Sequence, residues 1–299
     1  MPLTDPRAAL AALLAPGRLV RLPCAYDGLS ARVAQQCGFP AVAFSGNAVS
    51  ASLLGLPDIG VLDGNDNVAH AGRIARQLDI PLICDADTGY GGVMNVVRTV
   101  QEFEAAGVAG IHIEDQVTPK RCGLLPQGIP VVPVEEQVRK IRAAAQARRD
   151  PRFLLIARTD AKSMHGLEAA AARARAYVEA GADAAMVMGA NTPAELLHVA
   201  GVVRAPLVAV IQESPPTTAL TDADLEAAGC VLALHAGLAR YAVVRALQQS
   251  FGALRRDGHT AAVRDQLASF DDYNAVLGLD AWLALERQWL GDAPPARPA

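Results

Sequence analysis

Acidic side chains stand at the ends of two short apolar runs, at a spacing that suits a metal ion. Asp85 and Asp87 are separated by one residue, and Glu114 stands in the same relation to His112. Residues two apart in an extended chain face the same side. Carboxylates that converge without matching cations are unfavourable unless a cation binds, and hard oxygen ligands favour Mg2+ or Mn2+. The alternative is that the D-x-D pair only caps a helix.

An arginine follows the next apolar run. Arg158 can hold a carboxylate or a phosphate through two parallel hydrogen bonds. It can also form a structural ion pair with one of the nearby carboxylates, and the two roles are compatible.

A loop rich in proline and glycine follows Glu114 and carries a cysteine next to two cations. In the sequence Thr118-Pro-Lys-Arg-Cys-Gly123, Lys120 and Arg121 come directly before Cys122, and the loop runs to about Pro133. Neighbouring cations favour the thiolate form of a cysteine, and a loop of this length can act as a lid. The alternative is a surface cysteine beside unrelated basic residues.

Eight apolar runs of strand length alternate with longer alanine-rich stretches of helical periodicity, such as Val93–Ala106, Val134–Ala147 and Gly166–Ala180. This alternation predicts an α/β fold of the TIM (β/α)8 type, in which the active site lies at the carboxyl ends of the strands. The expected strands are Leu19–Ala25, Ala41–Ser45, Pro81–Asp85, Gly110–Glu114, Phe153–Arg158, Ala184–Met188, Pro206–Ile211 and Cys230–His235.

A weak internal repeat supports the barrel. Four expected helices end in a small residue followed by glycine directly before a strand, at Gly38, Gly107, Gly181 and Gly229. Glycine suits the left-handed turn that ends a helix.

The sequence predicts one catalytic domain with a helical extension. We expect the barrel over residues 1–239, a C-terminal helical appendix over 240–291 and a disordered, proline-rich tail over 292–299. Within the appendix, residues 240–255 and 261–290 have helical patterns, and we expect them to pack on a neighbouring subunit or on the barrel flank.

Composition narrows the functional class. The chain has 299 residues and a formal net charge of −4, so it lacks the basic excess that a nucleic acid or an anionic membrane would attract. Five cysteines without a C-x-x-C pair indicate a reducing compartment. No signal peptide and no apolar run of membrane-spanning length is visible. We therefore expect a cytoplasmic protein with a small-molecule partner.

The chain resembles the isocitrate lyase/phosphoenolpyruvate mutase superfamily over nearly its whole length. The segment that points to the lyase branch, similar to methylisocitrate and dimethylmalate lyases, is Pro119-Lys-Arg-Cys-Gly123. The other segments that carry the resemblance are Ala25-Tyr-Asp-Gly-Leu-Ser-Ala-Arg, Ser45-Gly46, Leu56-Pro-Asp-Ile-Gly60, Asp85-Ala-Asp-Thr-Gly-Tyr-Gly91, His112-Ile-Glu-Asp115 and Ala157-Arg-Thr-Asp-Ala161.

The resemblance implies a barrel whose last helix is swapped between subunits of a homotetramer. It implies Mg2+ held by four carboxylates, partly through water, and Cys122 as the acid/base on a mobile loop, with Lys120 and Arg121 assisting. The implied metal residues are Asp58, Asp85, Asp87 and Glu114. The implied residues that bind a 2-hydroxy or 2-oxo acid are Ser45, Gly46, Asn47, His112, Gly123 and Arg158.

Four positions depart from the pattern of tricarboxylate-cleaving lyases, each by an apolar residue where those enzymes have a polar one. They are Ala43, Leu124, Met188 and Val210. A substrate with several carboxylates would lose hydrogen-bond partners, each worth roughly 1–3 kcal/mol if left unpaired. This disfavours isocitrate and 2-methylisocitrate as substrates.

The favoured hypothesis is a Mg2+-dependent carbon–carbon lyase that cleaves a substituted malate-type 2-hydroxy acid to pyruvate or glyoxylate plus a carboxylic acid. One alternative on the same scaffold is a hydrolase or decarboxylase of oxaloacetate-like acids, or a phosphonate mutase. The other is a non-catalytic relic that binds a metabolite.

Overall fold

A closed barrel of parallel strands forms the centre of the fold. The structure is a computed structural model that describes residues 5–14, 17–123 and 128–290. Within these residues eight strands pair in sequence order, and the last pairs with the first. This confirms the predicted TIM-type barrel. The strands are Val20–Ala25 (β1), Val42–Phe44 (β2), Leu82–Asp85 (β3), Gly110–Glu114 (β4), Leu154–Thr159 (β5), Ala184–Val187 (β6), Leu207–Ile211 (β7) and Cys230–His235 (β8).

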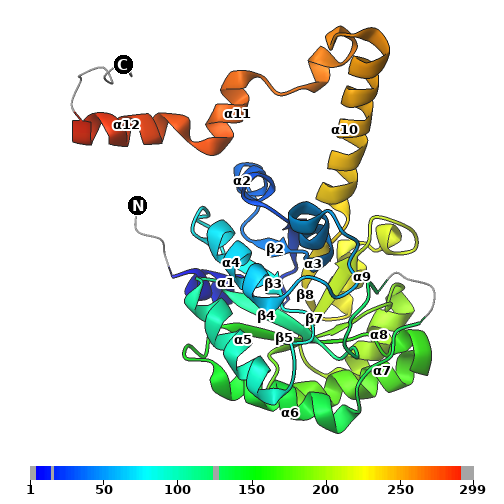
Figure 1. The fold of residues 1–299 in the computed structure, drawn as a ribbon. Helices are drawn as coiled ribbons and strands as arrows, with labels where there is room; N and C mark the ends of the chain where they lie inside the picture. The colour runs from blue at the N-terminus through cyan, green and yellow to red at the C-terminus, as the bar shows by residue number, and fades with distance from the viewer. Residues whose placement is uncertain (1–4, 15–16, 124–127, 291–299) are drawn as a thin grey trace. The chain divides into compact units, whose positions relative to one another are not determined.

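Helices alternate with the strands, and α5, α6, α7 and α8 lie outside them (Figure 1). A π-helical turn, Ser50–Leu54, continues α3. The helices are Pro6–Leu13 (α1), Gly28–Gln36 (α2), Gly46–Val49 (α3), Gly64–Ala75 (α4), Val93–Ala105 (α5), Val134–Ala147 (α6), Lys162–Glu179 (α7), Pro193–Val203 (α8), Asp222–Ala227 (α9), Leu238–Asp257 (α10), Phe270–Leu277 (α11) and Leu279–Leu290 (α12).

The predicted glycine stops are confirmed. Gly38, Gly107, Gly181 and Gly229 have φ angles of 85°, 88°, 116° and 69° and follow α2, α5, α7 and α9. This left-handed conformation is readily open to glycine and turns the chain back toward the next strand.

Two layers of apolar side chains hold the barrel together. Alternate strand residues point inward and pack into an interior cluster, which includes Leu22, Ile83, Ile156, Met186 and Leu234. Leu10 of α1 belongs to this cluster and is fully buried, so α1 packs against the barrel interior. A second cluster joins β2–β5 to their covering helices.

Strand register brings the expected site residues together. Asp85 on β3 lies beside His112 on β4, and Glu114 on β4 lies beside Arg158 on β5. Because the strands are parallel, all four residues lie toward the same end of the barrel.

The chain divides into two compact units, Met1–Tyr241 and Ala242–Ala299. In the second unit the expected helical segment 261–290 is interrupted. A short 3-10 turn, Ala261–Gln266, ends at the extended residue Leu267, and the left-handed residue Gly278 separates α11 from α12. The expected tail 292–299 lies outside the described residues. None of the described helices is long and apolar enough to cross a membrane.

Candidate active site

A pocket at the carboxyl ends of the strands collects most of the expected site residues. It has about 640 Å³ of empty space, part of it open to solvent. The expected residues that line it are Ser45, Asn47, Asp58, Asp85, His112, Cys122, Gly123 and Arg158. Gly46, Asp87, Glu114 and Lys120 lie directly around these residues, as their contacts below show.

The two carboxylates of the D-x-D pair converge, but not because they continue one strand. β3 ends at Asp85, and Asp87 lies beyond it with a left-handed φ of 47°. The backbone N–H of Asp87 donates to Oδ1 of Asp85 at 3.0 Å. The turn after the strand therefore brings the two side chains together, which corrects the alternation argument made from the sequence.

Gly46 provides the close approach that this arrangement needs. A Cβ atom at Gly46 would lie 2.7 Å from Oδ2 of Asp85 and 3.4 Å from Oδ1 of Asp87. Since the first distance is well inside van der Waals contact, only glycine lets the start of α3 lie against both carboxylates. The neighbouring Ser45 caps α3 by accepting a hydrogen bond from the N–H of Ala48.

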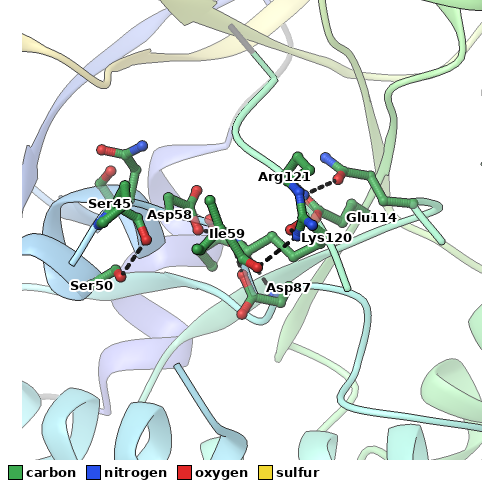
Figure 2. A network of polar contacts seen from close by, with 12 residues as sticks. Ser45, Ser50, Asp58, Ile59, Asp87, Glu114, Lys120 and Arg121 are labelled. Atoms are coloured by element: carbon green, nitrogen blue, oxygen red, sulfur yellow. Dashed lines mark hydrogen bonds and ion pairs between the residues drawn. The ribbon is translucent and has the colours of Figure 1, made fainter. Parts of the chain in front are cut away.

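Lys120 lies between two of the acids. Its Nζ is 2.6 Å from Oδ1 of Asp58 and 2.7 Å from Oδ1 of Asp87, and the side chain is only 6% exposed (Figure 2). The expectation of an acidic cluster without cations is therefore wrong. The ammonium that the sequence places beside Cys122 reaches the carboxylates instead.

Arg158 is the second cation of the cluster. Its Nη1 lies 2.9 Å from Oε2 of Glu114, and its Nε and Nη2 donate to the two carboxylate oxygens of Asp160 at 2.9 Å each. The structural ion pair considered from the sequence is thus present. Arg158 also lines the pocket, so both of its considered roles are compatible with the structure.

Negative charge still exceeds positive charge in the cluster. Five carboxyl groups, those of Asp58, Asp85, Asp87, Glu114 and Asp160, contact two permanent cations, Lys120 and Arg158, and one histidine. Burial raises the pKa of Asp87 and raises that of Glu114 well above its usual range, despite the nearby cations. Protons or a bound cation can supply the missing positive charge.

Asp85 behaves differently from its neighbours. Burial acts to raise its pKa, but His112, Lys120 and Arg158 together outweigh burial and lower it. Burial also lowers the pKa of His112 itself, so the histidine is mainly neutral at neutral pH. The positive charges that keep the pKa of Asp85 low are therefore those of Lys120 and Arg158, and Asp85 stays ionised.

The donor set fits Mg2+ held partly through water. In the described part of the chain, no three acidic, histidine or cysteine side chains are arranged to ligate one metal ion directly. Mg2+ usually takes one or two carboxylates and keeps several waters. The ionised carboxylate of Asp85, the excess of carboxylates around it and the buried, unpartnered Oε1 of Glu114 suit an ion of this kind.

Cys122 lies at the edge of the pocket, held by the backbone of a neighbouring segment. Its N–H donates to the carbonyl of Asp58 at 3.1 Å, and the side chain lines the pocket. The guanidinium of Arg121 donates to the carbonyls of Ile59, Pro119 and Lys120. Arg121 thus braces the loop, which sequence adjacency alone did not indicate.

Two of the four apolar departures line the pocket. Met188 and Val210 are both part of its wall. Ala43 packs in the barrel interior instead, and Leu124 lies outside the described residues.

Two polar residues of the pocket wall were not predicted from the sequence. Gln212 follows β7 and Arg240 follows β8, and both line the pocket. Asp160 belongs to the segment Ala157–Ala161 singled out from the sequence, but its contact with Arg158 was not predicted. The available signal was their position after a strand on the catalytic rim.

Comparison with known proteins identifies the family. Residues 10–255 match the phosphoenolpyruvate phosphomutase family model. The chain belongs to the phosphoenolpyruvate mutase/isocitrate lyase superfamily. It is 38% identical over 277 residues to the 2,3-dimethylmalate lyase of Eubacterium barkeri, which covers 93% of this chain and 96% of that protein.

Two solved structures of this superfamily match the whole barrel. A crystal structure of 2,3-dimethylmalate lyase is 34% identical, has a TM-score of 0.90 and covers 100% of both chains. A phosphonopyruvate hydrolase in complex with oxalate and Mg2+ is 34% identical, has a TM-score of 0.86 and covers 96% of this chain and 100% of that one. The chain is thus a superfamily member of the lyase and hydrolase type.

Proposed function

We propose that this chain is a Mg2+-dependent carbon–carbon lyase. It cleaves a substituted malate-type 2-hydroxy acid into pyruvate or glyoxylate and a carboxylic acid. The observation that carries the proposal is that Cys122 lines the same pocket as Asp85, His112 and Arg158. A thiol there can exchange a proton with a substrate held by the charged cluster.

The charged end of the pocket would bind the 2-oxo-acid part of the substrate. Arg158 has donors for a carboxylate. The backbone at Ser45 and Gly46, the Asn47 side chain, neutral His112 and the backbone at Gly123 complete the polar wall. Gly123 lies close to Arg158 and Asp160, so the Cys122 loop reaches this end of the pocket.

Cleavage requires one proton to leave the substrate hydroxyl and one to reach the departing carbon. As the C2–C3 bond breaks, its electron pair goes to C3, and C2 becomes the carbonyl of the oxo acid. We assign to the Cys122 thiol the proton delivered to C3; in the condensing direction its thiolate removes that proton. The base that takes the hydroxyl proton is left unassigned.

The carboxylates Asp58, Asp85, Asp87 and Glu114 would hold the metal, partly through water. When bound, Mg2+ (or Mn2+) would supply positive charge that offsets the negative charge on the substrate oxygens. Lys120 would neutralise part of the acidic cluster, and Arg121 would keep the loop in place.

Replacing the thiol tests the proposal. Cys122→Ser should lower turnover by a factor of about 10²–10⁴, because a hydroxyl is a far weaker acid than a thiol. Binding of oxalate with Mg2+, measured by calorimetry, should remain. The matched control is Cys37→Ser, since Cys37 is an exposed free cysteine outside the pocket. Unchanged turnover in Cys122→Ser would refute the assigned role.

A second candidate is a hydrolase, decarboxylase or mutase on the same scaffold, favoured by the likeness to the phosphonopyruvate hydrolase. Product analysis separates these activities: pyruvate with CO2, oxalate with acetate, or a product with a C–P bond. If the protein binds neither oxalate nor pyruvate with Mg2+ and cleaves no 2-hydroxy acid, the relic is favoured instead.

We also propose that the chain assembles into a homotetramer in which the C-terminal helices are exchanged between subunits. The support is the exposure of large apolar side chains on α10, α11 and α12. Neither α11 nor α12 has a buried residue in the isolated chain. Helices with unburied apolar faces normally pack against a partner.

A further inference from the structure

Arg240 faces the active-site pocket from the side of β8. It stands in the first turn of α10, within the first compact unit, and lines the pocket. In the barrel order β1 lies between β8 and β2. Arg240 donates from Nη1 to Oδ1 of Asn47, which follows β2, so the contact crosses the end of β1.

The guanidinium of Arg240 has neutral partners. Besides Asn47 it donates from Nη2 to the hydroxyl of Tyr241 at 3.1 Å and lies 4.8 Å from the centre of that ring. Among the described residues, no carboxylate lies within ion-pair distance of it. Arg158 and Lys120, by contrast, each contact two carboxylates.

One donor of Arg240 is buried without a partner. Its Nε has no hydrogen-bond acceptor in the described structure, and a buried unpaired donor is unfavourable. The charge also acts on the pocket: burial raises the pKa of the Cys24 thiol, another pocket residue, to about 12, and Arg240 opposes that rise. Arg240 thus brings to the pocket wall a cation that has no carboxylate partner among the described residues.

The pocket wall formed by the ends of β6, β7 and β8 is mainly apolar, with Gln212 as its polar exception. The apolar residues of this wall are Met186, Met188, Val210, Leu234 and Ala236. Such a surface suits alkyl groups, and apart from the amide of Gln212 its side chains offer no hydrogen bonds to further carboxylates. The pocket therefore has an acidic end, where we propose that the metal binds, and a mainly apolar part with one available cation.

We propose that Arg240 binds the carboxylate of the departing acid while the apolar wall takes its alkyl substituent. This inference rests on the proposed lyase function and deepens it. One anchoring cation beside an apolar wall selects a departing fragment with one carboxylate and an alkyl group. The substrate class is thus an alkyl-substituted malate, and Arg240 is its specificity-determining residue.

The test compares Arg240→Gln with the full-length wild type on 2,3-dimethylmalate and on its C4 carboxamide, with Mg2+ present. The variant should raise KM for the dicarboxylate by about 10-fold or more, with kcat little changed, because it removes a charge-assisted contact. KM for the carboxamide should change little. Arg240→Lys should have an intermediate KM, since it keeps the charge without the planar fork.

Two controls separate recognition from a general disturbance of the pocket. The Kd of oxalate, measured by calorimetry, should be the same in Arg240→Gln and wild type. Arg245→Gln removes an exposed arginine of the same helix that does not line the pocket, and its kinetics should match the wild type.

The experiment distinguishes a failure of the Arg240 assignment from a failure of the proposed lyase function. If the wild type cleaves 2,3-dimethylmalate and Arg240→Gln has an unchanged KM, or loses oxalate affinity equally, the role of Arg240 is overturned and the lyase stands. If the wild type cleaves nothing, the lyase proposal fails. The assignment of Arg240 is then tested by titrating the wild type and Arg240→Gln with 2,3-dimethylmalate. Weaker binding by Arg240→Gln than by wild type then supports Arg240 as the residue that binds the C4 carboxylate, and equal or absent binding overturns this assignment.

Discussion

Lys120 shows how one side chain can link the metal-binding cluster to the catalytic loop. It is close in sequence to Cys122, yet its ammonium lies between Asp58 and Asp87. Two buried carboxylates therefore depend on a cation carried by the loop that also presents the proposed acid. A cation bound in the cluster would share this neutralising task with Lys120.

This arrangement makes the stability of a Lys120 variant dependent on Mg2+. Lys120→Met should destabilise the metal-free protein by roughly 3–5 kcal/mol, since it leaves buried carboxylates unpaired. Mg2+ should restore part of this loss by supplying charge to the same groups. Thermal unfolding with EDTA and with Mg2+ measures the difference.

The control for this prediction is Lys162→Met. Lys162 forms an ion pair with Glu195 away from the acidic cluster. The stability that Lys162→Met loses should be the same with and without Mg2+. If Lys120→Met lost the same stability with and without Mg2+, this would contradict the idea that Mg2+ and Lys120 neutralise the same carboxylates.

The sequence located the site residues better than it described their contacts. It grouped Asp85, Glu114 and Arg158 correctly, because parallel strands bring their carboxyl ends together. It misplaced the cation of Lys120, because a long flexible side chain can reach well beyond its sequence neighbours. Arg240 was missed because residue 240 was taken as the start of a peripheral appendix, although it lies in the first turn of the helix that follows β8.

Asp115 directly follows β4 and connects the end of that strand to β5 and α7 through hydrogen bonds. It is fully buried and accepts hydrogen bonds from the hydroxyls of Thr159 and Tyr177 at 2.7 and 2.8 Å and from the N–H of Asp160 at 3.0 Å. Arg173 adds a contact at 3.4 Å. These bonds fix the end of β5, from which Asp160 holds Arg158.

Removing this carboxylate should destabilise the barrel. Asp115→Ala leaves several buried donors unpaired and should lower the free energy of unfolding by about 3–5 kcal/mol. Urea unfolding followed by circular dichroism measures this. Asp271→Ala, at an exposed position of α11, should change stability by no more than about 0.5 kcal/mol. Equal stability of the Asp115 variant and wild type would contradict the structural role.

The elements themselves were largely predictable. No end of the eight strands differs from its predicted position by more than one residue, because short apolar runs mark buried parallel strands. The breaks after the 3-10 turn and at Gly278 were not predicted. The apolar spacing over 261–290 continues through both, so periodicity alone does not reveal them.

At the scale of the whole molecule, the second unit exposes large aromatic side chains. Phe270, Trp282 and Trp289 are 78%, 62% and 75% exposed. Monomeric proteins seldom leave so much apolar surface in water. A second copy of the chain supplies the partner in the proposed tetramer.

Light scattering coupled to size-exclusion chromatography tests the assembly. The wild type should elute as an oligomer, and the double variant Trp282→Asp/Trp289→Asp should shift toward smaller species, because buried unpaired charges are unfavourable. Met94→Asp changes an exposed apolar residue of α5 and should leave the assembly intact. A monomeric wild type would rule out the proposed exchange of helices.

The central claim is the metal-dependent cleavage of a malate-type acid in the pocket of Cys122 and Asp85. Its most direct test is to quantify both products after incubating the protein with Mg2+ and a panel of alkyl-substituted malates. The account predicts equal amounts of pyruvate or glyoxylate and the matching carboxylic acid from at least one substrate, abolished by EDTA and restored by Mg2+. No oxo acid from any substrate, or cleavage that persists in EDTA, would contradict it.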